Sequence, residues 1–316
     1  MAAYYTFQDL SGGQQTLSTT ASSNPYVGLI EACNDDPSVI QARYNTHRTT
    51  RNAQQRDRLL SFEFPGVTVD EILARLEDPT IEPGFKDWRH CLVFWARPPE
   101  GVRKLIAEIQ RRVLTVAPHT WIMPPPNLHM TALEITHSLT APEIDDLVKQ
   151  MLPGLSDMVD YTYDHRARLI MPLLSYDAQA LALSFLPAAG EGGRSAQKDE
   201  YSYHHLRRDL FDKATATGVK VASRYVIPSA HLTIARFVTK RDFETAGGEV
   251  DHAKVRQLIE MMDGINEWLK IEFWPQSGKI EPGGEWIVGE GVGLECRKGA
   301  LWYGSDGETV KLGQGF

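Results

Sequence analysis

The sequence lacks the patterns that mark disulfide frameworks, secretory signals and membrane spans. Only three cysteines occur in 316 residues (Cys33, Cys91 and Cys296), and none belongs to a CxxC pair, so they cannot form a disulfide framework. No stretch approaches the roughly 20 consecutive apolar residues that span a bilayer. The first residues, MAAYYTFQDL, lack a basic segment followed by an apolar one. These absences predict a reducing compartment, the cytoplasm or the nucleus, and no membrane partner.

Long runs of positive charge are absent too. Lysine and arginine number 33, aspartate and glutamate 41, and the net charge is −8; basic residues gather only in short pairs such as Arg207-Arg208. Because a long nucleic acid is bound by neutralising many of its phosphates, we expect no long nucleic-acid tract as a partner. A small or end-on phosphate substrate fits this charge better. The sequence also lacks a GxxxxGK[ST] loop, a GxSxG elbow and the HExxH or Cys/His zinc patterns.

What is present is a mixture of strand and helix patterns, which predicts an α+β fold with a sheet in each of two lobes. We expect residues 1–84 to form an N-terminal extension, loose over about the first 25 residues and then helical, with a helix at 68–76 capped by Thr68 and Glu71. Residues 85–316 are predicted to form the two-lobed domain. Its predicted strands are 90–96, 127–136, 167–174, 180–186, 229–238, 271–274, 285–288, 293–295 and 301–302, and its helices are 102–114, 143–151, 201–217 and 253–269.

Two segments of this domain resemble each other. Leu128–Leu133 (LHMTAL) and Ala230–Ala235 (AHLTIA) both read apolar, His, apolar, Thr, apolar, apolar, and each follows a proline-containing loop. Since side chains alternate along a strand, the histidine and the threonine of each segment share one face.

Such a pair suits phosphoester chemistry. Cleavage of a cyclic phosphodiester needs a base that activates water and an acid that protonates the leaving oxygen, and histidine serves both roles near neutral pH. Threonine hydroxyls can hold the non-bridging oxygens as charge develops on them. A single His-x-Thr means little, but two copies with matching flanks favour a functional interpretation.

The sequence resembles the two-histidine (2H) phosphoesterase superfamily, which contains RNA 2′–5′ ligase-like proteins and 2′,3′-cyclic nucleotide phosphodiesterases. The residues that carry the resemblance are HCLVFWARPPEGVRKLIAEIQ, PPPNLHMTALEI and IPSAHLTIARF, and it extends over about residues 88–302. It implies a duplicated, two-lobed fold whose antiparallel sheets line a central cleft, with helices outside. It also implies that His129 and His231 are the acid/base pair, that Thr131 and Thr233 bind phosphate, and that no metal or other cofactor is needed. The distance between the motifs is long for the family, which indicates an inserted loop at 187–200.

Three further residues are candidates for substrate binding. Arg236 ends the second motif, but strand alternation points it away from the face of His231, which favours a salt bridge. Trp121 precedes the proline loop and is expected either to wall the cleft or to pack. Tyr203 begins a helix, where it can stack on a nucleobase or pack in the core.

The resemblance predicts hydrolysis of a 2′,3′-cyclic phosphate or a related RNA-end phosphodiester, with a small nucleotide or RNA end as the partner. Two alternatives stay open. The same cleft could perform acid–base chemistry on a non-nucleotide small molecule, or the protein could bind a nucleotide or RNA end without turnover. The residues do not tell which histidine is the base, nor the oligomeric state.

Overall fold

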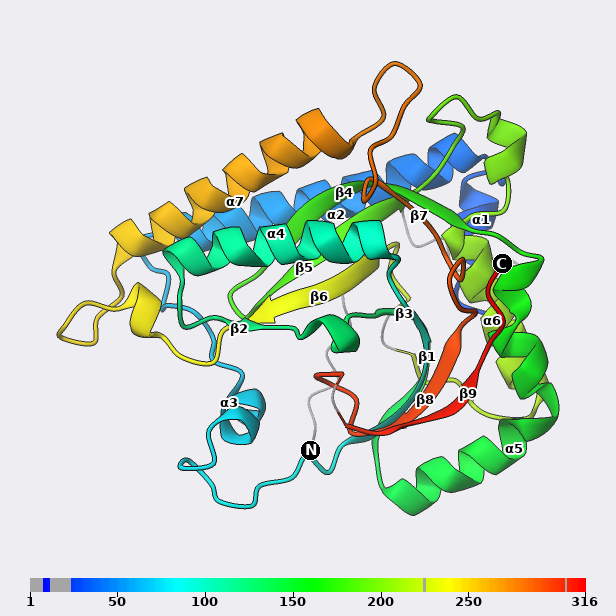
Figure 1. Cartoon of the computed structure of the whole chain (residues 1–316), viewed down its shortest axis with the longest axis horizontal. Coiled ribbons are helices and arrows are strands. Elements are labelled where there is room, and N and C mark those ends of the chain that lie inside the picture. Colours follow the sequence, from blue (N-terminus) through cyan, green and yellow to red (C-terminus); the bar gives the residue numbers. More distant parts are fainter. Residues whose placement is uncertain (1–7, 12–23, 224–225, 305) are drawn as a thin grey trace.

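Helices and antiparallel strands are mixed along the chain, with helices at its start and strands at its end (Figure 1). A computed structural model describes residues 8–11, 24–223, 226–304 and 306–316, so most of the predicted loose arm lies outside the described residues. The helices are α1 (Val27–Ala32), α2 (Pro37–Leu60), α3 (Glu71–Glu77), α4 (Glu100–Val116), α5 (Ala141–Val159), α6 (Tyr203–Ala216) and α7 (His252–Phe273), with 3₁₀ turns η1 (Pro125–Asn127), η2 (Tyr161–Tyr163), η3 (Ala196–Asp199) and η4 (Arg241–Phe243). The strands are β1 (His90–Ala96), β2 (Trp121–Ile122), β3 (Met130–Leu139), β4 (Arg168–Tyr176), β5 (Ala180–Pro187), β6 (Ala230–Arg236), β7 (Glu285–Ile287), β8 (Glu295–Gly299) and β9 (Glu308–Leu312).

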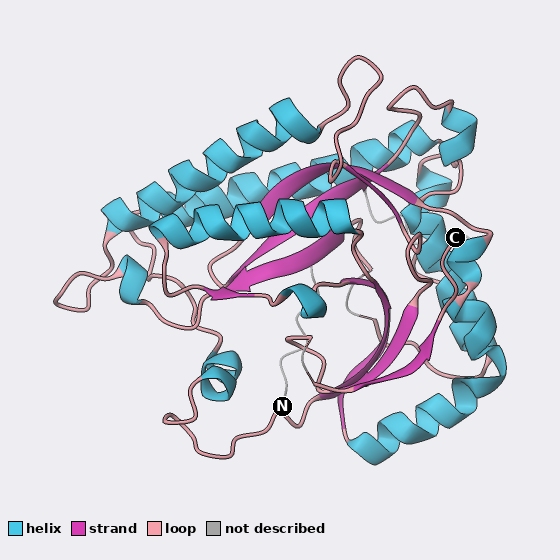
Figure 2. Cartoon of the chain, in the orientation of Figure 1, coloured by secondary structure: helices cyan, strands magenta, loops and turns pink. Residues whose placement is uncertain are grey.

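The strands form two sheets. One has four strands in the order β3-β1-β8-β9, and the other has five in the order β2-β6-β5-β4-β7. Every pairing between neighbouring strands is antiparallel. Figure 2 shows the helices at the periphery of the two sheets. The predicted α+β fold, with two lobes of antiparallel sheet and helices outside, is therefore confirmed.

Apolar faces of the helices hold them on the sheets. In α4 the apolar residues recur at the three- and four-residue spacing of a helix face, and five of them are buried: Val102, Leu105, Ile106, Ile109 and Val113. Helix α4 packs against α7 and β6, α7 packs against β4, and α5 packs against β1, β8 and β9. Motif-bearing strands β3 and β6 lie beside each other, although they belong to different sheets.

Helix α2 packs on the five-stranded sheet partly through polar side chains. Its first turn is capped by the carboxylate of Asp36, which accepts hydrogen bonds from the backbone of Ser38 and Val39. Side chains of α2 donate to three backbone carbonyls of β4: Arg48 to Met171 at 2.7 Å, Arg51 to Tyr176 at 3.2 Å and Asn52 to Leu174 at 3.0 Å. Residues N-terminal to 84 thus pack against a lobe of the protein. The division of the chain at residue 84 stays a prediction.

A buried histidine joins this N-terminal part to α6. Nε2 of His204 lies 3.0 Å from the backbone oxygen of Tyr26 and therefore donates to it. Nδ1 consequently accepts from the hydroxyl of Tyr44 at 2.9 Å. All three side chains are at most 1 % exposed, and burial lowers the pKa of His204 to about 3. The imidazole is thus neutral, with both of its nitrogens satisfied.

The predicted start of α3 is wrong by two residues. Asp70, not Thr68, caps the helix, because its carboxylate accepts from the backbone of Leu73 at 3.2 Å. Thr68 is still in an extended segment, where its backbone nitrogen donates to Ala178.

Several short strands near the C-terminus were also predicted wrongly. Residues 271–273 continue α7, which ends at Phe273, and Trp274 follows it in extended conformation. The helix continues because Ile265, Leu269 and Phe273 keep a four-residue helical spacing and Phe273 packs edge-on against Trp268. Residues 301–302 lie in a turn, and of 293–295 only Glu295 is in a strand. The edge strand β9 was not predicted, since its sequence ETVKL is largely exposed and carries no core-facing pattern.

Candidate active site

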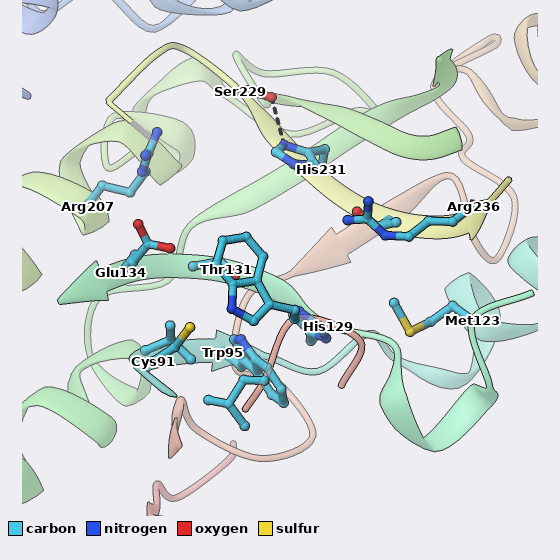
Figure 3. Close-up of a pocket in the computed structure, with 14 residues that line it drawn as sticks. Cys91, Trp95, Met123, His129, Thr131, Glu134, Arg207, Ser229, His231 and Arg236 are labelled. Carbon is cyan, nitrogen blue, oxygen red and sulfur yellow. Dashed lines mark hydrogen bonds between the residues drawn. The ribbon is translucent and has the colours of Figure 1, made fainter. Parts of the chain in front are cut away.

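Both His-x-Thr motifs contribute to one cavity of about 100 Å³ between the two sheets. Figure 3 shows its lining. Strand β1 contributes alternate residues, and β3 and β6 contribute the two motifs. The lining consists of Cys91, Val93, Trp95, Met123, His129, Thr131, Glu134, Arg207, Ser229, His231, Thr233, Arg236, Leu301 and Trp302. The structure therefore brings together His129, Thr131, His231, Thr233 and Arg236 of the residues chosen from the sequence.

His129 lies just before β3 and is fixed by two contacts. Its Nδ1 is 2.6 Å from the backbone oxygen of Asn127. A carbonyl oxygen only accepts, so Nδ1 carries the proton and the Nε2 lone pair is left for another partner. The imidazole also stacks on the indole of Trp95, with ring centroids 3.8 Å apart and planes 17° apart.

Burial lowers the pKa of His129 to about 3, and the hydrogen bond to Asn127 offsets only part of this. Positive charges of Arg97 and Arg297, and of His231 when protonated, act in the same direction as burial. His129 is therefore neutral near pH 7.

His231 lies on β6, where its Nδ1 is 3.0 Å from Oγ of Ser229. A hydroxyl can donate or accept, so this contact leaves the tautomer open. Burial lowers the pKa of His231 to about 4, and the nearby charges of Arg51, Arg207 and Arg236 act in the same direction. Both cavity histidines are thus neutral near pH 7 in the free protein.

The motif strands share an irregularity that the sequence did not reveal. On β3, Thr131 pairs with Trp95 and Leu133 with Phe94, so two residues of β3 span one residue of β1. On β6, Thr233 pairs with Ala182 and Ala235 with Leu181, so the same extra residue follows the second threonine. Each is a β-bulge.

A bulge reverses the alternation beyond it, so the residue three positions after each threonine returns to the threonine's face. These residues are Glu134 and Arg236, and both line the cavity. Figure 3 shows them at opposite ends of the cavity, with the histidines between them.

The expectation that Arg236 points away from the face of His231 was therefore wrong, because strict alternation ignores the bulge. The expected salt bridge of Arg236 is present, since its Nη1 lies 3.2 Å from Oδ2 of Asp70. Its guanidinium also lies over the ring of Tyr303, 5.6 Å from the centroid. The hydroxyl of Tyr303 donates to Oδ1 of the same carboxylate at 2.6 Å. Asp70, the cap of α3, thus links the N-terminal part of the chain to the cavity wall.

Two predicted substrate-binding residues are not part of the cavity lining. Tyr203 is fully buried, and its hydroxyl donates to the backbone oxygen of Thr131 at 3.0 Å. Of the two roles predicted for Tyr203, packing in the core is the one observed, and stacking on a nucleobase is corrected: Tyr203 holds the strand that carries Thr131. Trp121 is half-buried in β2, which pairs with β6 at Arg236, and its ring meets Tyr303 edge-on at 6.2 Å. A contact between Trp121 and substrate stays a prediction.

Sequence reasoning missed Trp95, Glu134 and Arg207. Trp95 lies in the run CLVFWA, where every residue is apolar enough to face a core, so the pattern could not show which face meets the cavity. Glu134 lies between the apolar residues Leu133 and Ile135 and is only 3 % exposed. A charged residue in a buried part of a strand is the signal that could have marked it. Arg207 was considered only as one of a basic pair, whereas its side chain is 1 % exposed and donates to the backbone oxygen of Ile227.

Two absences among the described residues concern metal ions and membranes. These residues contain no group of three or more His, Cys, Asp or Glu side chains arranged to hold a metal ion. None of their helices combines the length and apolarity needed to cross a bilayer.

The chain resembles several solved structures at low sequence identity. No protein-family model and no curated protein matches the chain. It is similar to the crystal structure of TT0787 of Thermus thermophilus, with 16% identity, 70% of this chain and 96% of that chain covered, and a TM-score of 0.38. A conserved protein of unknown function, ATU0111 from Agrobacterium tumefaciens, gives 12% identity, coverage of 60% and 76%, and a TM-score of 0.38. Usb1 of Kluyveromyces marxianus, solved with uridine monophosphate, gives 10% identity, coverage of 71% and 98%, and a TM-score of 0.36. TM-scores below 0.5 leave the activity of this chain to be argued from its own site.

Proposed function

We propose that this protein is a phosphodiesterase of the 2H type, which hydrolyses a 2′,3′-cyclic phosphate or a related RNA-end phosphodiester by paired-histidine acid–base catalysis. The observation that supports this best is the convergence of the two His-x-Thr motifs, one beside each sheet, on a single cavity. Each motif brings a group that can exchange a proton and a hydroxyl that can bind an oxygen.

The reaction needs one proton transfer at each side of the phosphorus. One histidine takes a proton from water as the water oxygen bonds to phosphorus. The bond from phosphorus to one ribose oxygen breaks, and the other histidine gives that oxygen a proton. The product is a phosphomonoester, and a proton exchange with solvent restores both histidines. Thr131 and Thr233 would bind the non-bridging oxygens, and Arg236 would add positive charge as negative charge develops.

The size of the cavity fits a reacting phosphate group better than a whole nucleoside. A cavity of about 100 Å³ is small beside the pockets of ~300–1,000 Å³ that enclose a drug-sized ligand. The nucleoside would therefore lie outside this cavity. A phosphodiester at the end of a nucleotide or RNA chain can place its phosphate in the cavity and leave the nucleoside outside.

The histidine that acts as the acid must take up a proton when the substrate binds, because both histidines are neutral in the free protein near pH 7. A bound anionic phosphate favours the charged form of a neighbouring imidazole and raises its pKa. The proton needed for the leaving oxygen thus becomes available when the substrate is bound.

The test is a hydrolysis assay with 2′,3′-cyclic nucleotides and with oligonucleotides that end in a 2′,3′-cyclic phosphate. Wild-type protein should convert at least one of them to a phosphomonoester. His129→Ala and His231→Ala should each lower kcat by at least ~10²-fold. His119→Ala is the matched control, because His119 is half-exposed and pairs with Asp242; this variant should keep full activity.

Lack of turnover on the whole panel would reject the proposal. Turnover of a non-phosphorylated compound that inorganic phosphate does not inhibit would favour acid–base chemistry on another small molecule. Tight nucleotide binding that neither alanine variant weakens would favour a binding module.

A further inference from the structure

The contact between His129 and Trp95 poses an electrostatic problem. The face of an indole carries negative partial charge and attracts cations. An imidazole stacked 3.8 Å from that ring would by this contact alone be stabilised in its protonated form. A base must be neutral before it can accept a proton, so the stacking by itself works against His129 as a base.

Two guanidinium groups already occupy the surroundings of this ring. The Cζ atom of Arg97 lies 4.9 Å from the Trp95 centroid, and that of Arg297 lies 5.1 Å from it. They satisfy the attraction of the ring for cations and repel a third positive charge. Protonation of the stacked imidazole is thereby disfavoured.

Glu295 holds the two arginines in place. Its carboxylate accepts from Nε of Arg97 at 2.6 Å and from Nη1 of Arg297 at 3.0 Å, and it also accepts from the hydroxyl of Thr309. The residue is only 6 % exposed. Burial raises the pKa of this carboxyl, but the three hydrogen bonds outweigh burial and lower it overall.

Arg97 also connects this cluster to the backbone that carries His129. Its Nη1 donates to the carbonyl oxygens of Pro126 at 3.1 Å and Leu128 at 3.2 Å, which flank the Asn127 carbonyl that accepts from Nδ1 of His129. The same arginine therefore shapes the loop that fixes the tautomer and lies over the ring that stacks on the imidazole.

We propose that Arg97, Arg297 and Glu295 form a positioning cluster around the ring of Trp95, and that this cluster keeps His129 neutral with its proton on Nδ1, so that Nε2 faces the cavity as the base. His231 is then the acid. The assignment of base and acid rests on the proposed function, whereas the protonation state of His129 does not. The other charged or titratable groups near His129 are His231 and, on the cavity wall, Glu134, Arg207 and Arg236.

The first experiment measures the protonation of His129 directly by two-bond ¹H–¹⁵N NMR, which separates the two tautomers and follows the pKa. Wild type should show the Nδ1–H form down to acidic pH. Arg297→Met should raise the pKa of His129 by on the order of one unit, because one repelling charge is removed, and Arg297→Lys should restore the low value.

Lys298→Met is the matched control, since Lys298 is the next residue of β8 and its ammonium pairs with Asp145 of α5 on the other side of the sheet. It removes the same charge and should leave the pKa of His129 unchanged. An Nε2–H tautomer in the wild type, or equal His129 pKa values in Arg297→Met and Lys298→Met, would overturn the proposal.

The second experiment uses the pH profile of kcat/KM on a substrate that the hydrolysis assay has identified. Loss of activity toward low pH reports protonation of the base in the free enzyme. Arg297→Met should move this acidic limb to higher pH and leave the alkaline limb in place, and Lys298→Met should move neither. Movement of the alkaline limb alone would assign His129 as the acid and reject the assignment made here. If no substrate is turned over, the proposed function fails, and the NMR result still decides the protonation state.

Discussion

Lowering the pH should destabilise this protein through His204, the buried histidine between Tyr26 and Tyr44. Its folded-state pKa is about 3, against ~6.5 in an unfolded chain. Between these values the unfolded state binds more protons than the folded state, so the stability that His204 contributes is fully present above pH 6.5 and is lost as the pH falls. From pH 7 to pH 5 the linkage for this single group amounts to about 2 kcal/mol.

The measurement is urea unfolding of wild type at pH 7, 6 and 5, with His204→Gln beside it. Glutamine does not titrate and keeps one donor and one acceptor, but it cannot match the geometry of both bonds. The variant should therefore be less stable than wild type at pH 7, while its stability should fall by about 2 kcal/mol less than that of wild type between pH 7 and pH 5. Equal pH slopes for wild type and His204→Gln would refute the reasoning.

Three further outcomes are expected. Asp70→Ala removes the cap of α3 and the partners of Arg236 and Tyr303, so it should lower the free energy of unfolding by about 2–3 kcal/mol in urea titrations and also lower kcat/KM; unchanged stability would contradict the role of this carboxylate. Asp199→Ala removes a carboxylate partner of the Arg168 guanidinium, which is only 3 % exposed. This variant should destabilise the protein by roughly 3 kcal/mol in the same assay. A loss of stability smaller than that from breaking an exposed ion pair would show that water replaces the carboxylate. Inorganic phosphate should raise the pKa of both cavity histidines from the free values of about 3 and about 4, because a bound anion favours the imidazolium; NMR titrations that superimpose with and without phosphate would argue against an anion site.

The core of the candidate site could be predicted from the sequence because it depends on a short-range rule. A side-chain period of two places His231 and Thr233 on one face of a strand, and both line the cavity. The rule fails one step later, at the bulges. A bulge depends on how a strand pairs with its neighbour, which cannot be read from the residues of that strand alone. For this reason the direction of Arg236 was predicted wrongly and Glu134 was missed.

The fold, too, was predictable only where a segment's own sequence pattern reflects what it packs against. Helix α4 was predicted from its apolar periodicity, which arises from burial against a neighbouring surface. Residues 45–58 of α2 gave no such pattern, because part of this helix meets the sheet through hydrogen bonds from Arg48, Arg51 and Asn52 to backbone carbonyls. Polar side chains that pack on a partner cannot be distinguished in the sequence from polar side chains that face water.

The bulges of β3 and β6 are alike in the backbone but bring side chains of opposite charge to the cavity. Equivalent positions of β3 and β6 present a carboxylate in one half and a guanidinium in the other. A ligand turned end for end would exchange its contacts with groups of opposite sign, so we expect the phosphodiester to enter in a single direction. The direction of binding in this cavity would then be set by one side chain in each strand, while the backbones of the two strands keep the same bulge.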